Sequence, residues 1–177
     1  MKHHDFSSER MNIRLIKREH AALIHPLFQD PALFTYLPED PPHLDKLEER
    51  YAFWESRESP DQSEYWLNYI VQLSESGEPI GTLQAGVHRE KREASIAYMI
   101  ATPFQGRGLG SEATAAMVHH LIASYQVRCV KAWIDTRNMA SIRLVEKLGM
   151  TRSEFLKDAD HFKGQSSDEW VYQMEVK

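Results

Sequence analysis

The stretch PFQGRGLGSEA, residues 103–113, contains three glycines at alternate positions, Gly106, Gly108 and Gly110, with Arg107 between the first two. Glycine reaches positive φ without steric cost, so such a run can turn successive backbone N–H groups toward one point. The helical pattern that follows adds unpaired N–H groups and the positive end of the helix dipole. Together with the charge of Arg107, this chemistry predicts a binding site for phosphate oxygens.

Two other phosphate-binding motifs fit this stretch less well. A Walker A loop needs a Lys-Ser or Lys-Thr pair, which is missing at the required spacing. GLGSEA at 108–113 matches the G-x-G-x-x-A pattern of dinucleotide-binding proteins, with Asp135 at a suitable distance. Seven residues separate Ile100, the end of the preceding apolar run, from Gly108, and little chain follows Asp135. An NAD(P)-dependent oxidoreductase is therefore the function that this stretch favours least.

A third motif uses more of the chain. QGRGLGSEA has the Q-x-x-G-x-G form and resembles the acetyl-coenzyme A loop of the GNAT superfamily of N-acetyltransferases. SIAYMI before the loop is similar to the family's preceding strand, and DTRNMASIRLVEKLGM after it is similar to the family's asparagine-initiated helix. The resemblance covers residues 80–155 and is strongest to the ribosomal-protein N-terminal acetyltransferase branch (RimJ/RimL type).

This resemblance implies that the strand ending near residue 101 splays from the strand at 130–135, forming a cleft for the pantetheine arm of acetyl-CoA. Buried unpaired backbone groups are costly, so a ligand that pairs with them is physically reasonable. The resemblance also implies that Asn138 contacts pantetheine and that Ser141 protonates or hydrogen-bonds the departing thiolate. The residues expected to bind acetyl-CoA are Met99, Ile100, Ala101, Gln105, Gly106, Arg107, Gly108, Leu109, Gly110, Ser111, Asn138 and Ser141.

The attacking amine must lose a proton, and the resemblance implies a glutamate for this purpose where the chain has Ser95. Glu93 lies two residues earlier on the same face of the strand. We therefore name Glu93, with Ser141, as the catalytic candidates, Glu93 acting directly or through water. The competing interpretation makes Glu93 a solvated hairpin residue beside Arg92 and leaves catalysis to positioning.

Other reactive side chains predict no separate site. His119 and His120 are adjacent on a predicted helix and point about 100° apart, without ligand-spaced partners, so we expect no metal. Cys129 begins an apolar strand and is interpreted as a core residue. His3 and His4 are expected to lie in a frayed N-terminus. The acidic residues that could flank an amine pocket are Glu39, Asp40, Asp45, Asp168 and Glu169.

The composition narrows the classes of partner and location. The chain has 177 residues, a formal net charge of −5 and one cysteine. We expect residues 1–177 to form one N-acetyltransferase domain. The charge favours a cationic partner over nucleic acid or an anionic membrane, and no apolar run approaches the ~20 residues of a membrane span. The single cysteine and the absence of a signal-like N-terminus predict a cytoplasmic protein.

The elements that position these residues predict an α+β fold with a mixed, mostly antiparallel central sheet flanked by helices, as in the GNAT family. Alternating apolar runs indicate strands and 3.6-residue periodicity indicates helices. The predicted strands span 12–18, 65–73, 79–89, 93–101, 128–135, 150–158 and 167–177. The predicted helices span 19–30, with an interruption at Pro26, 43–56, 111–125 and 138–149.

The function predicted from these observations is transfer of acetyl from acetyl-CoA to a primary amine, by direct attack in a ternary complex. The acceptor is a protein N-terminal α-amine or a small amine such as a polyamine or an aminoglycoside. A non-catalytic acyl-CoA sensor is the alternative, favoured by the missing glutamate at Ser95. The chain is expected to be a monomer or a homodimer.

Overall fold

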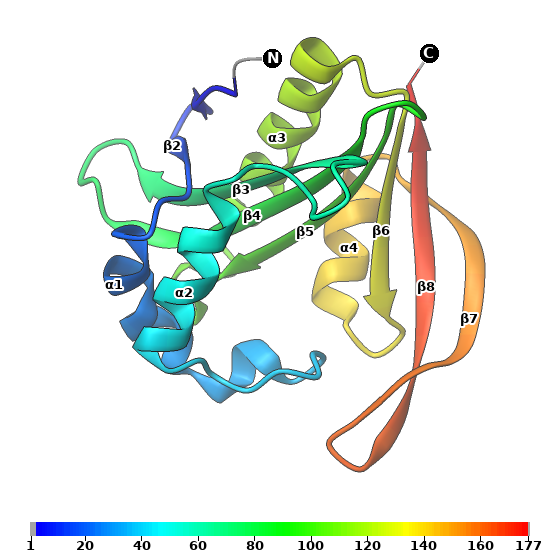
Figure 1. The fold of residues 1–177 in the computed structure, drawn as a ribbon. Helices are drawn as coiled ribbons and strands as arrows, with labels where there is room; N and C mark the ends of the chain where they lie inside the picture. The colour runs from blue at the N-terminus through cyan, green and yellow to red at the C-terminus, as the bar shows by residue number, and fades with distance from the viewer. Residues whose placement is uncertain (1–2, 177) are drawn as a thin grey trace.

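One eight-stranded sheet runs through residues 3–176, the part of the chain that this computed structural model describes (Figure 1). Its strands are β1 (Phe6–Ser7), β2 (Met11–Leu15), β3 (Glu64–Leu73), β4 (Pro79–His88), β5 (Glu93–Ile100), β6 (Cys129–Asp135), β7 (Thr151–Phe162) and β8 (Gln165–Glu175). They lie in the order β1-β2-β3-β4-β5-β6-β8-β7. All neighbours are antiparallel except β5 and β6, which are parallel.

Helices cover both faces of the sheet (Figure 1). The α-helices are α1 (His20–Ile24), α2 (Leu44–Trp54), α3 (Leu109–Tyr125) and α4 (Met139–Lys147), with 3₁₀ turns at His25–Gln29, Pro31–Phe34 and Thr102–Phe104. The apolar side of α3, which includes Met117, packs in the main core with Ile96 of β5. On the opposite face Tyr51 of α2 packs in a smaller cluster with Ile70 of β3. The sheet is therefore the middle of three layers.

Residues of β5 alternate between these two faces, as the strand period of two requires. Ile96 and Ile100 belong to the core under α3, with Tyr98 packed against it. Met99 instead packs against the cluster under α1 and α2. The face to which a β5 side chain belongs therefore decides which helices it meets.

The predicted architecture and element order are confirmed, with local differences that have physical causes. Helix α1 ends at Ile24, and Pro26 lies in a separate 3₁₀ turn because proline has no N–H to donate. Helix α3 begins at Leu109, two residues earlier than predicted. The expected fraying at the N-terminus is wrong for His3, whose Nδ1 lies 2.8 Å from the Tyr125 hydroxyl. Residues 1, 2 and 177, at the ends of the predicted domain, lie outside the described residues.

Between residues 3 and 176 no helix is both long and apolar enough to cross a membrane. Within that range no group of three or more His, Cys, Asp or Glu residues is arranged to hold a metal ion.

Candidate active site

The parallel strands β5 and β6 pair only at one end. The ladder joins Glu93 to Cys129, Ala94 to Val130 and Ser95 to Lys131, and then stops. Beyond Ser95 the other edge of β5 stays paired with β4, and the other edge of β6 stays paired with β8. The two strands diverge from this point, with α4 between them in the view of Figure 1. Five further residues of β5, about 16 Å of extended chain, thus present an unpaired edge to β6.

The direction of the backbone groups on β5 decides which of them face this opening. The Ala101 N–H donates to Ile80 O at 2.9 Å, so it points toward β4. Because successive residues of a strand alternate in direction, the backbone of Ile100 points toward β6. The Ile100 carbonyl indeed accepts a hydrogen bond from Gln105 Nε2 at 2.8 Å on that side.

This alternation refines the predicted edge of the site. Ile100 has the predicted geometry, whereas the Ala101 N–H is already bonded and the Ala101 carbonyl accepts from Phe104 N at 2.9 Å. Ala101 is therefore wrong as a source of free backbone groups, and by the same alternation the Met99 N–H faces β4. Tyr98 and Ile96, which the sequence interpretation left out, present their backbone to the opening instead. Gln105 holds the end of β5 through its side chain.

The glycine loop forms a concentration of backbone donors at the open end of β5. Gly106 and Gly108 have φ of 72° and 75°, the left-handed values predicted for a turn of this kind. The N–H groups of residues 106–111 find no acceptor among residues 3–176, whereas the Glu112 N–H makes the first helical bond, to Gly108 O at 3.1 Å. Such a group of donors at a helix N-terminus fits a diphosphate.

Gly110, which the sequence predicts as part of the glycine turn, serves the packing of α3. It lies inside α3 without a positive φ, and a Cβ there would come within 3.4 Å of both Ile100 Cγ1 and Leu144 Cδ1. Gly110 therefore allows α3 to approach β5 and α4 closely. This contact sets the distance between the loop and the splayed strands.

A second arginine lies beside the loop, from a distant part of the chain. Arg10 donates through Nε to Glu112 Oε2 at 2.7 Å and through Nη1 to Arg107 O at 3.3 Å. Its Nη2 lies 3.6 Å from the position that a Cβ on Gly108 would occupy. Arg10 therefore neutralises the one carboxylate in the first turn of α3 and adds positive charge next to the predicted phosphate site.

Helix α4 begins as the sequence predicts. Asn138 is its N-cap, and the Asn138 side chain accepts from Ser141 N at 3.1 Å. The Tyr98 hydroxyl of β5 donates to Ser141 O at 3.2 Å, linking the splayed strand to the first turn of α4. Burial raises the pKa of Tyr98 to about 12, so the phenol stays protonated near neutrality. A hydrogen bond with Ser141 lowers the pKa of Tyr98 but is outweighed by burial.

Glu93 does not stand free at the site. Its Oε2 accepts from Lys131 Nζ at 3.1 Å, where β5 and β6 are still paired. The same bond raises the pKa of Lys131, which favours the charged form of the lysine. An amine proton would have to displace this ion pair, which weighs against Glu93 as the base.

Asp135 fixes the turn between β6 and α4. Its side chain is 2% exposed and accepts from Arg137 Nη2 at 2.6 Å and from Ser167 Oγ at 2.7 Å. Burial alone would raise the pKa of Asp135, but the hydrogen bonds from Arg137 and Ser167 outweigh it and hold that pKa below its usual value. The Asn138 N–H donates to Asp135 O at 2.9 Å. Asp135 thus positions the start of α4, and it is no free ribose ligand of a dinucleotide site.

Residues on the far side of the opening connect the β7–β8 hairpin to the segment that precedes α2. Lys163, at the hairpin turn, donates to Phe34 O and lies 3.8 Å from Asp40 Oδ1. Arg137 lies 6.0 Å from the ring of Tyr36. Burial, with the charges of Asp160 and Asp135, raises the pKa of Glu169 on β8. This side of the opening is therefore acidic near β6 and β8. Two of the predicted acidic residues already have partners there, because Asp40 lies beside Lys163 and Asp168 accepts from Asp158 N.

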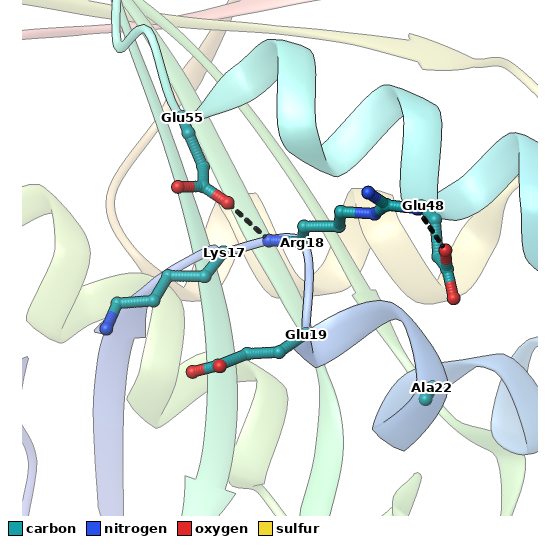
Figure 2. A pocket seen from close by; sticks show the side chains of 6 residues that line it. All are labelled: Lys17, Arg18, Glu19, Ala22, Glu48 and Glu55. Atoms are coloured by element: carbon teal, nitrogen blue, oxygen red, sulfur yellow. Dashed lines mark hydrogen bonds and ion pairs between the residues drawn. The ribbon is translucent and has the colours of Figure 1, made fainter.

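A separate hollow of about 390 Å³ lies between the start of α1 and helix α2 (Figure 2). Arg18 dominates it, with its guanidinium 2.9 Å from Glu48 Oε2 and its backbone N–H donating to Glu55 Oε1 at 2.6 Å. Figure 2 shows both carboxylates turned toward Arg18. The charges of this hollow are thus largely paired with one another, and none of the predicted site residues lines it.

Comparison with known proteins assigns the chain to a family. Residues 10–151 match the family model described as an acetyltransferase (GNAT) domain. The chain therefore belongs to the GNAT acetyltransferase family, as its motifs predict. It is an N-acetyltransferase, and acetyl-CoA is its cosubstrate. YkkB of Bacillus subtilis (strain 168), an uncharacterized protein, is 30% identical over 157 residues, which cover 85% of this chain and 87% of YkkB.

Solved structures share the fold at lower identity. RimL, a ribosomal L7/L12 alpha-N-protein acetyltransferase in complex with coenzyme A, superposes with a TM-score of 0.88 at 18% identity and 98% coverage of both chains. A spermidine N-acetyltransferase from Vibrio cholerae, in complex with CoA and spermine, gives 0.80 at 19% identity, covering 94% of this chain and 95% of that one. At these identities the likeness shows the shared fold.

The buried ion pair of Asp135 predicts a pH-dependent loss of stability. Asp135→Asn should lower the free energy of unfolding by about 2 kcal/mol at pH 7, because Arg137 loses its charged partner. The pKa of Asp135 is depressed in the folded state, so its contribution is complete above its unfolded pKa of about 4 and is lost as pH falls below that value. Urea unfolding at pH 7, 5 and 3.5 should show a gap between the two proteins that narrows only at pH 3.5. A gap independent of pH would contradict this.

The glycine loop predicts a specific loss of cosubstrate binding. Gly108→Glu places a carboxylate among the N–H groups of the loop, so the affinity for CoA should fall by at least about tenfold in calorimetric titration. Gly164→Glu is the matched control, because Gly164 has a similar φ of 74° and open space in the β7–β8 turn, away from the glycine loop. Both variants should unfold at similar urea concentrations. Equal CoA affinities would refute the assignment of the loop.

Proposed function

We propose that residues 1–177 form one N-acetyltransferase domain that transfers acetyl from acetyl-CoA to a primary amine by direct attack in a ternary complex. The observation that carries this proposal is the unpaired edge of β5 beyond Ser95, which leads from the donors at 106–111 to the start of α4. A ligand with a diphosphate at one end and an amide-containing arm can bond both to the N–H groups of residues 106–111 and to the unpaired backbone groups of β5. In this arrangement residues 106–111 hold the diphosphate, with Arg10 and Arg107 adding charge.

Direct attack is favoured because the single cysteine of the chain is a poor nucleophile. Cys129 is buried, and burial raises the pKa of its thiol to about 11, so little thiolate exists at neutral pH. The Ile100 N–H faces the opening and is a backbone donor for the part of the arm next to the diphosphate. Asn138 contacts the arm and Ser141 assists the departing sulfur. A reducing, cytoplasmic location also suits a protein with a single unpaired cysteine.

The proposed acceptor is a cationic primary amine, and the RimJ/RimL type is the proposed branch. Glu169 and Asp160 place carboxylates on this side of the opening, and these would attract a cation. Two relatives in structure define the acceptor classes to compare. RimL is described as an alpha-N-protein acetyltransferase, and the Vibrio cholerae enzyme as a spermidine N-acetyltransferase.

Thiol release from acetyl-CoA, measured with N-terminal peptides, spermidine, spermine and an aminoglycoside, tests the proposal. Release with at least one amine, and a stoichiometric acetylated product by mass spectrometry, are the expected results. Binding of acetyl-CoA without release across the whole panel would replace the enzyme with a non-catalytic sensor. No thermal stabilisation by acetyl-CoA at about 100 times a micromolar Kd, where ~2.7 kcal/mol is expected, would reject both.

Ser141→Ala should separate turnover from binding. Loss of the hydroxyl removes assistance to the thiolate, so kcat should fall by about tenfold to a hundredfold while the Kd for acetyl-CoA changes by less than about threefold. Ser124→Ala is the control. Ser124 lies near the C-terminal end of α3, away from the glycine loop, so kcat and the Kd for acetyl-CoA should both stay unchanged. Unaltered kcat in Ser141→Ala would remove this residue from the mechanism.

A further inference from the structure

The side chains of Glu64 and Ser95 lie on either side of Gly86 in the middle of the sheet. Gly86 of β4 pairs with Trp66 of β3 and with Ser95 of β5. A Cβ on Gly86 would lie 2.8 Å from Ser95 Oγ and 3.2 Å from Glu64 Oε2. Ser95 Oγ donates to Gly86 O at 3.4 Å, and Glu64 comes from the other neighbouring strand, so the hydroxyl and the carboxylate border the space that a larger residue at Gly86 would fill.

The carboxylate of Glu64 is held in this place with capacity to accept a proton. Trp66 Nε1 donates to Glu64 Oε2 at 3.1 Å, and the Trp66 ring packs against Phe53 of α2 at 6.0 Å between centroids. Glu64 Oε1 makes no hydrogen bond to any of residues 3–176, and Glu64 takes part in no ion pair within that range. In this it differs from Glu93, which Lys131 neutralises.

The position along β5 places this pair at the inner end of the opening. Ser95 is the last residue of β5 that pairs with β6, so an arm that enters from the glycine loop has its far end near Ser95. The acyl group is at that far end of the arm. Glu64 and Ser95 therefore lie where the reacting carbonyl arrives.

The face of the sheet is also suitable. Ser95 shares the face of Met99, which packs with α1 and α2, whereas Tyr98 contacts Ser141 on the face of α4. An amine that approaches from the side of α1 and α2 meets Ser95 first, with Glu64 behind it. The departing sulfur is then on the side of α4, near Ser141. Proton removal and proton donation are thus separated by the strand itself.

We propose that Glu64 accepts the proton of the attacking amine through the hydroxyl of Ser95, an inference that rests on the proposed function. The amine attacks in its neutral form, after an ammonium acceptor has released one proton to water. Its nitrogen forms the C–N bond to the thioester carbon while a nitrogen proton passes to Ser95 Oγ, and the Ser95 hydroxyl turns from Gly86 O and passes its own proton to Glu64. The C–S bond breaks and its electron pair leaves with sulfur, which takes a proton from Ser141. Ser141 regains a proton from water, and Glu64 releases one. The products are an N-acetyl amine and coenzyme A.

Three variants test this assignment, with an amine that the wild type acetylates. Glu64→Gln keeps an acceptor for Trp66 Nε1 but removes the base, so kcat should fall by about a hundredfold or more while calorimetry shows an unchanged Kd for acetyl-CoA. Ser95→Glu in the Glu64→Gln background returns a carboxylate to the same space and should recover at least about tenfold of the lost kcat. Gly86→Ala puts a methyl group between the two side chains and should lower kcat without the loss of a charge.

Glu58→Gln is the matched control. Glu58 lies at the same end of the sheet but pairs with Arg89 at 2.6 Å, and Arg89 covers the ring of Tyr65 on the opposite face. Its kcat should equal that of the wild type. If Glu64→Gln does not fold, the kcat of Gly86→Ala alone tests the role of Glu64.

The outcomes distinguish this inference from the function on which it rests. Unchanged kcat in a folded Glu64→Gln protein, or in Gly86→Ala where that variant decides, overturns the role of Glu64 and leaves the acetyltransferase intact. Failure of Ser95→Glu to restore any activity to Glu64→Gln also overturns it, because a structural defect would not respond to a carboxylate moved to β5. No turnover by the wild type with any amine overturns the proposed function, and this inference with it.

Discussion

The parting of β5 and β6 after Ser95 and Lys131 is the constraint on which the rest of the site depends. A parallel pair that stops early leaves N–H and C=O groups without partners on both strands, and such groups are costly wherever water is excluded. Neither strand can close the opening, because β4 and β8 hold their outer edges. A ligand whose arm can pair with these groups as a strand would is the natural partner.

The two ends of this opening supply different chemistry. At the outer end Gly106 and Gly108 turn backbone donors toward a common point, and Gly110 lets α3 approach β5. At the inner end the alternation of β5 separates Ser95, on one face, from Tyr98, on the other. In the proposed mechanism this strand lines the cosubstrate along its edge, with Ser95 on one side and Ser141, next to Tyr98, on the other.

The parts of the site that depend only on residues close together in the sequence could be predicted from it. The left-handed glycines and the cap at Asn138 follow from local conformational preferences, and the element order follows from periodicity. The direction of the Ala101 N–H could not be predicted, because it depends on whether β4 pairs with even or odd residues of β5. A register one residue different would exchange the roles of Ile100 and Ala101.

Contacts between distant segments were also beyond the sequence. Arg10 reaches the loop because β2 and the start of α3 come together, although 97 positions separate it from Arg107. Glu64 lies next to Ser95 only because Gly86 between them has no side chain. Neither residue belongs to a motif, so spacing alone gives no signal. The sequence interpretation placed the base on Glu93, whose ion pair with Lys131 forms only when β5 and β6 align.

Residue-resolved amide hydrogen exchange by NMR, with and without saturating acetyl-CoA, tests the splayed edge most directly. The account predicts that exchange slows at Ile100 and at residues 106–111 on binding, while the Ala101 amide, already bonded to Ile80, is protected in both states. Tight binding of acetyl-CoA with no added protection at Ile100 or in the loop would contradict the account, since the cosubstrate would then be held elsewhere.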